Sequence, residues 1–246
     1  MTQVLATYNI KGGVGKTSAA VNLAYLAARE NNNVLLWDLD PQGASTFLFR
    51  VKPKVKGGGR KLVRGKSEVE ALIKGTDHER LDLLPADFSY RHMDLALDST
   101  KNPTRRLAKL LKPLAGDYDY VFLDCPPSIS LVSESVFEAA DALLVPLVPA
   151  TLSSRTYDQL RRVVAENGDG PSLLAFFSMF DRRKRLHREV MDELWEGNGS
   201  VLQAGIPAAA DVERMGVRRD AVAAFAPRSR AAKAYEELWR EVRESL

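Results

Sequence analysis

The sequence predicts an α/β protein in which helices cover both faces of a mostly parallel central sheet. Short apolar runs recur along the 246 residues, and helical stretches lie between most of them. Strands that alternate with helices pair in parallel, because each helix carries the chain back across the sheet. Neither a repeat nor a linker rich in Pro, Gly and Ser interrupts this order. Residues 1–246 are therefore predicted to form a single domain.

The first predicted strand, 3–10, is followed by an Ala- and Leu-rich helix over 17–30. The later strands are apolar runs, several with acidic or proline ends, at 33–40, 80–87, 118–127, 141–150 and 171–180. Further helices are predicted over 103–115, 153–166 and 185–196. A last helix, docked on the sheet, is expected because one face gathers Tyr235, Leu238, Trp239, Val242 and Leu246.

The composition is that of an ordinary globular protein, with 45% hydrophobic and 27% charged residues. A single cysteine, Cys125, excludes a disulfide framework within the chain and favours a reducing cytoplasm. The N-terminus does not have the pattern of a signal peptide, and no apolar run reaches about 18 residues. A cytoplasmic protein without a membrane span is expected. The net charge of +3 does not by itself indicate a nucleic acid partner.

Residues 9–18, NIKGGVGKTS, contain a phosphate-binding loop with one departure from the usual pattern. That pattern is Gly, four residues, then Gly-Lys-[Ser/Thr]. Ile10 replaces the leading glycine, and a second lysine, Lys11, follows it. Lys16 is predicted to reach the β- and γ-phosphates, and Thr17 to place its hydroxyl on Mg²⁺. The predicted nucleotide contacts of the loop and helix start are Gly12, Gly13, Val14, Gly15, Lys16, Thr17 and Ser18.

Carboxylates at predicted strand ends supply candidates for the metal and for the attacking water. Asp124 ends the apolar run VFLD, which is the Walker B arrangement. Asp38 and Asp40 end the run NVLLWDLD, and strand alternation predicts that both lie on the same side. Either could orient a water for in-line attack, and their spacing alone does not choose between them.

The order KGGVGKT, then DLDPQG, then a strand ending in DCPP resembles the ParA/MinD family of deviant Walker A ATPases, a group of P-loop NTPases. The resemblance continues through PAD at 85–87, the strand at 144–149, MFD at 179–181 and IP at 206–207. It is closest to the short ParA types. It implies ATP hydrolysis with Mg²⁺ and a homodimer that closes when ATP is bound.

The resemblance also assigns roles to single residues. Lys11 matches the signature lysine, which reaches the partner's phosphates across the dimer. Asp40 matches the switch I aspartate that positions the attacking water. The implied catalytic residues are Lys11, Lys16 and Asp40, and the implied metal ligands are Thr17, Asp38 and Asp124. By family analogy alone, the adenine base is expected near Met179 and Pro207.

Two basic clusters in the last third of the chain favour the ParA branch, which binds DNA without sequence preference. The clusters are Arg182, Arg183, Lys184, Arg185 and Arg188, then Arg214, Arg218 and Arg219. Basic side chains on phosphates give sequence-independent, salt-sensitive binding, although either cluster could instead be a solvated helix face.

The implied function is a nucleoid-associated switch that partitions or positions a chromosome, a plasmid or a large cytoplasmic assembly. A ParB-like protein or a small adaptor would stimulate hydrolysis and release the dimer from DNA.

Two alternatives and one unassigned segment remain. A MinD-like ATPase would use a basic C-terminal helix on membranes, but the polar face of the last helix is mostly acidic, so no membrane partner is expected. A metabolic ATP-dependent ligase of similar fold has no use for Lys11. Residues 50–66 contain eight Lys/Arg and no acid. They are predicted to form a mobile basic loop, either a solvated excursion or a polyanion contact.

Overall fold

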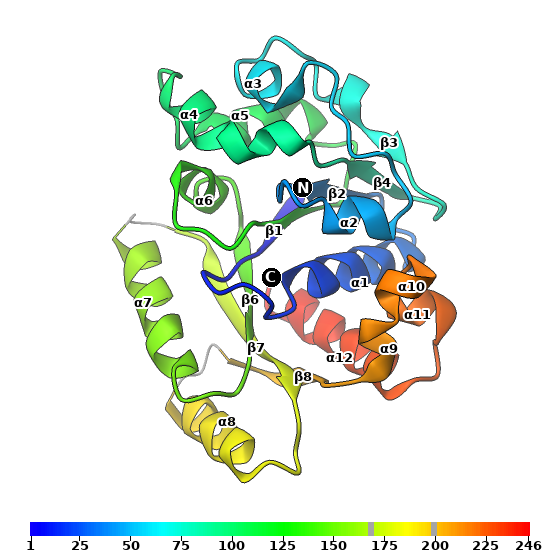
Figure 1. The fold of residues 1–246 in the computed structure, drawn as a ribbon, viewed down its shortest axis with the longest axis vertical. Coiled ribbons are helices and arrows are strands. Elements are labelled where there is room, and N and C mark those ends of the chain that lie inside the picture. Colours follow the sequence, from blue (N-terminus) through cyan, green and yellow to red (C-terminus); the bar gives the residue numbers. More distant parts are fainter. Residues whose placement is uncertain (167–169, 198–200) are drawn as a thin grey trace.

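A computed structural model describes residues 1–166, 170–197 and 201–246 and contains one eight-stranded sheet (Figure 1). Every neighbouring pair of strands is parallel except β3 with β4, so the predicted mostly parallel fold is confirmed. The order across the sheet is β3-β4-β2-β5-β1-β6-β7-β8. The strands are β1 (Gln3–Thr7), β2 (Val34–Asp38), β3 (Lys74–Gly75), β4 (Leu81–Leu84), β5 (Tyr120–Asp124), β6 (Ala142–Leu147), β7 (Ser172–Phe180) and β8 (Val201–Pro207).

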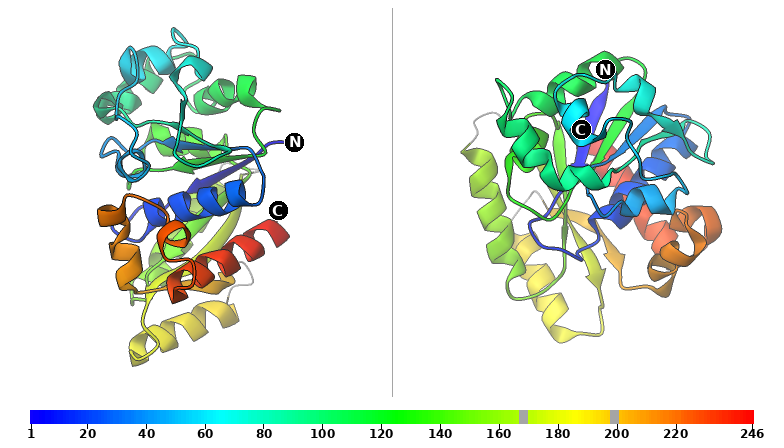
Figure 2. Two further views of the ribbon diagram at one scale, coloured as in Figure 1. Left: turned by 90° about the vertical axis from the view of Figure 1, so that its right-hand side faces the viewer. Right: turned by 45° about the horizontal axis from the view of Figure 1, so that its top comes forward.

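Helices lie on both faces of this sheet, as predicted (Figures 1 and 2). One face packs against α1 (Lys16–Arg29), α2 (Ala44–Leu48), α10 (Met215–Arg218), α11 (Val222–Phe225) and α12 (Arg230–Glu244), with α9 (Ala210–Glu213) beside them. The other packs against α3 (Gly58–Val63), α4 (Met93–Asp98), α5 (Arg106–Leu111), α6 (Leu131–Phe137), α7 (Ser153–Ala165) and α8 (Arg185–Gly197). Strand alternation divides the core, since Leu36 faces the first set while Leu35 and Trp37 face the second.

The C-terminal helix α12 docks on the sheet as predicted, beside α1 (Figure 2). Trp239 is buried and its indole N–H donates to Glu30 at 3.0 Å. The acidic side of α12 takes part in this docking, because the Glu241 carboxylate accepts from the backbone N–H of Gln203 and Ala204 on the edge strand β8. Leu246 was expected on the docked face, but it lies beyond the helix and is 44% exposed. Among the described residues, no helix has both the length and the apolar composition that a bilayer span requires.

Two element predictions differ from the structure in ways that have local causes. The helix predicted over 103–115 is shorter, because α5 passes into a 3₁₀ turn, Lys112–Leu114, that contains Pro113. The strand β8 was not predicted at all, since Gln203 and Gly205 interrupt its short apolar pattern.

The expectation of a loop without helix over 50–66 is wrong for its middle part. Gly57 and Gly58 have φ of 91° and 68°, a left-handed entry that lets the chain turn into α3. The side chains of Leu62 and Val63 are then buried in the core, while the lysines stay exposed. The segment is therefore attached to the domain through its apolar residues. Further 3₁₀ turns, Glu70–Leu72 and Phe88–His92, follow it along the chain.

Candidate nucleotide site

The glycine loop between β1 and α1 has the backbone that a phosphate cradle requires. Gly13 and Gly15 have φ of 71° and 98°, where side chains are strained. A Cβ atom on Gly15 would also lie 2.6 Å from the hydroxyl of Ser178 on β7, so only glycine fits. Helix α1 begins at Lys16, which directs its unpaired backbone N–H groups toward the loop.

Asn9 is a structural residue of this loop that the sequence analysis missed. It is 4% exposed, its side-chain amide donates to the Pro146 carbonyl at 2.9 Å, and its Oδ1 accepts from the Lys11 backbone N–H at 2.9 Å. These bonds fix the loop at the position where the usual leading glycine is absent. The available signal was a polar amide directly between an apolar strand and Ile10.

Lys16 lies inside the loop with its side chain 7% exposed. Its ammonium donates to the Lys11 carbonyl at 3.0 Å. Burial lowers the pKa of Lys16, and the nearby charge of Asp124 opposes that shift. A phosphate would supply the negative charge that favours the ammonium form at this position.

Asp124, at the end of β5, is fully buried beneath the loop. Its Oδ2 accepts from the Ser45 hydroxyl at 2.6 Å, and burial raises its pKa while hydrogen bonds from Ser45 and Thr17 oppose the rise. Thr17 and Asp124 are thus brought together. A hydroxyl beside a carboxylate, with phosphate oxygens to complete the set, matches the oxygen ligands that Mg²⁺ prefers. No group of three or more His, Cys, Asp or Glu among the described residues forms a separate cage.

Asp38 and Asp40 differ in burial but lie close together, since the Asp40 backbone N–H donates to Asp38 Oδ1 at 3.2 Å. Strand β2 ends at Asp38, which is fully buried, and the next turn begins at Asp40, whose carbonyl accepts from the Gly43 backbone N–H at 2.9 Å. The Thr46 backbone N–H and hydroxyl both donate to Asp38 Oδ2, at 2.8 and 2.7 Å. Burial raises the pKa of Asp38, and the neighbouring charge of Asp124 raises it further. Asp40 is half-exposed, and its Oδ1 accepts from the Gln42 backbone N–H at 2.9 Å.

A cavity of about 260 Å³ opens over the loop. Met179 forms one wall of the cavity. It lies at a β-bulge with a φ of 56°, and it is 43% exposed. Pro207, the other residue expected near the base, is buried and pairs with Phe180 on the neighbouring strand. Val14 is also buried, whereas Lys11 is exposed. The cavity is lined by Gly12, Gly13, Gly15, Lys16, Thr17, Ser18, Asp40, Pro127 and Met179.

The first basic cluster surrounds the start of α8, and part of its charge is already neutralised. Arg183 forms an ion pair with Asp181 at 2.9 Å, and Arg185 with Glu189 at 2.6 Å. The remaining basic members, all exposed, are Arg182, Lys184 and Arg188.

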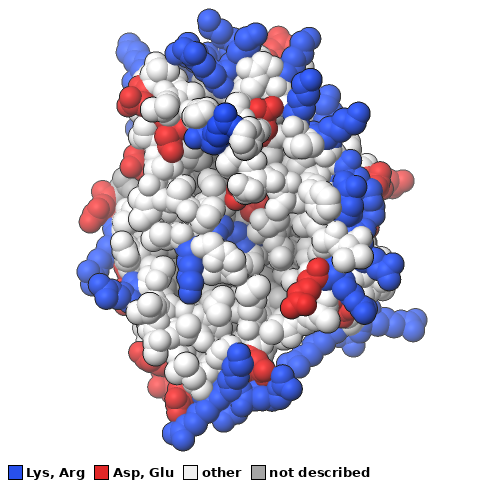
Figure 3. Space-filling model, viewed as in Figure 1, with Lys and Arg blue, Asp and Glu red and all other residues white. Residues whose placement is uncertain are grey.

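The second cluster lies at α10 and contacts α2, the helix that holds both buried aspartates. The Arg219 guanidinium stacks over the Phe47 ring at 4.5 Å, and its Nε donates to the Phe47 carbonyl at 3.0 Å. Arg50 donates to the Arg218 carbonyl at 2.8 Å, and Arg214 is exposed nearby in sequence. Figure 3 shows basic side chains around the rim of a face whose centre is mostly uncharged.

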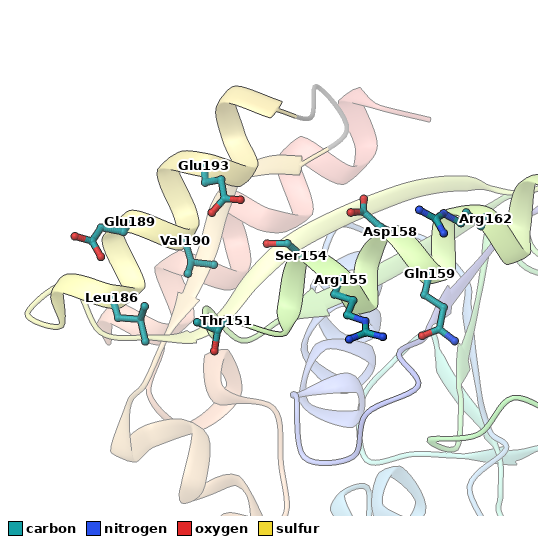
Figure 4. Close-up of a pocket in the computed structure, with 10 residues that line it drawn as sticks. All are labelled: Thr151, Ser154, Arg155, Asp158, Gln159, Arg162, Leu186, Glu189, Val190 and Glu193. Atoms are coloured by element: carbon teal, nitrogen blue, oxygen red, sulfur yellow. The ribbon is translucent and has the colours of Figure 1, made fainter.

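A larger groove of about 800 Å³ lies between α7 and α8, away from the glycine loop (Figure 4). Its α7 wall carries Arg155 and Arg162, and its α8 wall carries Glu189 and Glu193. It contains no glycine-rich turn. The groove therefore lacks the backbone donors that distinguish the smaller cavity.

The strand–glycine loop–helix unit, the buried Lys16 and the paired Thr17 and Asp124 define a P-loop nucleotide hydrolase. The model of a family described as an AAA domain matches residues 2–168. The chain is 32% identical to the chromosome partitioning protein ParA of Caulobacter vibrioides (strain NA1000 / CB15N), over 98% of this chain and 93% of the relative. It is 29% identical to the sporulation initiation inhibitor protein Soj of Bacillus subtilis (strain 168), over 98% of both. The chain belongs to the ParA/MinD family of partition and positioning ATPases.

Two solved structures share the fold of this chain. The ADP- and magnesium-bound cobyrinic acid a,c-diamide synthase of Mycobacterium smegmatis has a TM-score of 0.84 and 29% identity, covering 98% of this chain and 94% of that one. A putative plasmid partition protein of Borrelia burgdorferi B31, bound to AMPPNP, has a TM-score of 0.87 and 21% identity over the whole of both chains. The second likeness shows the fold alone. The protein is an ATPase, and its ligands are ATP and Mg²⁺.

Proposed function

We propose that the protein is an ATP-dependent dimerising switch that binds DNA without sequence preference and partitions or positions a cargo. The observation that carries this proposal is the position of Lys11. Lys16 already occupies the phosphate loop, while Lys11 is exposed at its start, and no ion pair or side-chain hydrogen bond of the described residues involves its ammonium. Because Lys16 fills the cation position inside the loop, the exposed ammonium of Lys11 is free to contact the phosphates of a second subunit.

The roles of the site residues follow from their positions. Lys16 would meet the phosphates of its own subunit, and Thr17 with Asp124 would hold Mg²⁺, which supplies positive charge to the phosphates when it is bound. Asp38 holds α2 next to the metal site by accepting two hydrogen bonds from Thr46. Asp40, in the cavity wall, orients the attacking water. Lys11 of each subunit meets charge that develops on the other subunit's γ-phosphate.

The face around the loop is suited to pairing two subunits. Its centre is mostly uncharged (Figure 3), and Pro127, Ile129 and Met179 expose apolar surface at or near the cavity. Two subunits joined there would double the number of basic clusters available to one DNA molecule. The affinity for DNA should therefore rise on dimerisation and fall with salt. A ParB-like protein or a small adaptor would stimulate hydrolysis and return the protein from the nucleoid to a free monomer.

Two alternative functions have less support from the structure than the proposed one. A MinD-like membrane role would require α12 to leave its dock, where Trp239 and Val242 are buried. The 29% identity to the structure described as a synthase suggests a ligase as the second alternative. A ligase mechanism, however, does not explain the second lysine of the loop, Lys11.

Gel shifts on two unrelated DNA duplexes, with ATP and with ADP, test the proposal. We expect ATP-dependent binding to both duplexes that weakens with salt. Equal binding in ADP and ATP, or strong preference for one duplex, would contradict it. Binding to vesicles of anionic lipid without binding to DNA would favour the MinD-like alternative. Monomeric behaviour in ATP, measured by light scattering, would favour a ligase.

A further inference from the structure

A cleft of about 710 Å³ lies at the β3 edge of the sheet, between residues 49–57 and residues 71–77. It shares no lining residue with the nucleotide cavity. Its only acidic lining residue, Asp77, pairs with Arg50 at 2.9 Å. The remaining charged residues of the lining are Lys52, Lys54, Lys56 and Lys74, and none of them forms an ion pair among residues 1–166, 170–197 and 201–246.

The lysines come from both walls of the cleft. Three alternate along the segment that follows α2, and Lys74 stands opposite on β3. Figure 3 shows basic side chains gathered in this upper right part of the molecule, near α2 and β3 of Figure 1. Asp87, outside the lining, offsets part of the Lys54 charge, but the positive charge that remains around the concavity still favours an anionic occupant.

The cleft also offers an apolar lining and an open strand edge. Val51 is half-buried, and the lining residues Phe49 and Leu72 are almost fully buried. Strand β3 is the edge of the sheet, and within the described part of the chain its one strand partner is β4. An open edge pairs with an extended peptide through backbone hydrogen bonds, while pockets beside it select the side chains.

We propose that this cleft binds an extended acidic segment of a partner protein. Its backbone lies along β3, its carboxylates meet the four lysines, and an apolar side chain rests on Val51. Duplex DNA fits less well, because its phosphates lie on a convex surface and have no use for an apolar wall or a strand edge. The inference goes beyond the proposed function and stands whether or not the α8 and α10 clusters bind DNA.

Fluorescence anisotropy of a labelled peptide of about ten residues, alternating Glu and Val, tests the proposal on the full chain. The cleft variant is Lys52→Glu/Lys54→Glu/Lys74→Glu. The control is Lys101→Glu/Lys109→Glu/Lys112→Glu, which makes the same charge change at exposed positions outside the cleft. We expect the cleft variant to lose at least about tenfold in peptide affinity, and the control to stay within about twofold. Basal ATP turnover of both variants should match the parent, which shows that they are folded.

A second arm tests the strand pairing. The same peptide with alternate backbone nitrogens methylated should bind at least about tenfold more weakly, because methylation removes N–H donors and blocks one edge. Equal peptide binding by the cleft and control variants would overturn the proposal, as would equal binding of the methylated peptide. A cleft variant that loses duplex DNA affinity as strongly as peptide affinity would assign the lysines to DNA instead. Failure of ATP-dependent DNA binding in the parent would affect the proposed function and leave the peptide result unchanged.

Discussion

The nucleotide end of the sheet and the basic rim of the molecule carry charge in opposite ways. Beneath the glycine loop, Asp38, Asp124 and Lys16 are buried, and each has a hydrogen-bond partner at a fixed distance. On the rim, the arginines of α8 and the lysines of the cleft are exposed. Removing one buried partner leaves another charge or donor unsatisfied, whereas removing one exposed charge is compensated by water. Single changes should therefore be severe at the site and small, but additive, on the rim.

Lys16→Ala should have the largest effect. It removes the cation that meets the phosphates within the same subunit, so ATP affinity should fall by about a hundredfold or more. Titration with a fluorescent ATP analogue measures this. Lys11→Ala is the matched control, because it removes an exposed lysine from the same loop. The affinity of this variant for ATP should stay within about threefold of the parent. Comparable losses in both variants would break the distinction between the two lysines.

Asp40→Ala and Lys11→Ala should separate hydrolysis from dimerisation. Without Asp40, phosphate release should fall by about a hundredfold or more while ATP stays bound, because only the positioning of water is lost. The variant should accumulate as an ATP dimer in light scattering. Lys11→Ala should stay monomeric in ATP. If Asp40→Ala turns over ATP like the parent, Asp38 becomes the candidate; if Lys11→Ala dimerises and hydrolyses normally, the cross-dimer role is wrong.

Thr46→Val should lower the free energy of unfolding by about 2 kcal/mol. The Thr46 hydroxyl donates to the buried Asp38 and accepts from the Ala86 backbone N–H at 2.8 Å, so both groups lose a partner. Urea denaturation measures the change. The matched control is Thr156→Val, since the Thr156 hydroxyl donates to the Leu152 carbonyl at 2.9 Å in a solvent-exposed hydrogen bond. Its effect should stay within about 0.5 kcal/mol, and equal losses would remove the contrast between buried and exposed sites.

The smallest effects should come from the two arginine clusters, and they should differ. Arg218→Gln/Arg219→Gln should weaken ATP-dependent DNA binding by about tenfold in low salt. Arg183→Gln/Arg185→Gln should cost only about threefold, because Asp181 and Glu189 already neutralise those two charges. Gel shifts over a range of salt concentrations measure both. A larger loss at α8 would show that its ion pairs open on DNA.

Sequence patterns predicted the parts of the fold that depend on local composition. The glycine loop, the helix after it and the apolar face of α12 follow directly from spacing and periodicity. The sequence could not show that Asp38 is buried, because its carboxylate is bound by Thr46, eight residues later in the chain. It also could not show α3, since the basic residues of 50–66 hide the buried pair Leu62 and Val63.

The site was predicted less completely than the loop. Lys16, Thr17 and Asp40 line the cavity, and the roles assigned to them stay predictions. Asn9 was missed because its partner, the Pro146 carbonyl, is 137 residues away in the chain. Pro207 was expected near the base from family analogy, which carries no information on whether the side chain is buried in this protein. Contacts between distant segments decide these points.

The short helix α2 contacts both the nucleotide end and the α10 cluster through three consecutive residues. Ser45 and Thr46 bind the two buried aspartates, while the next residue, Phe47, binds Arg219. If ATP tightens DNA binding through this helix by some factor, DNA must tighten ATP binding by the same factor, because linkage between two ligands is reciprocal. DNA would then favour the ATP-bound state, and the ATP affinity measured with and without a DNA duplex should differ by the factor by which ATP changes the DNA affinity.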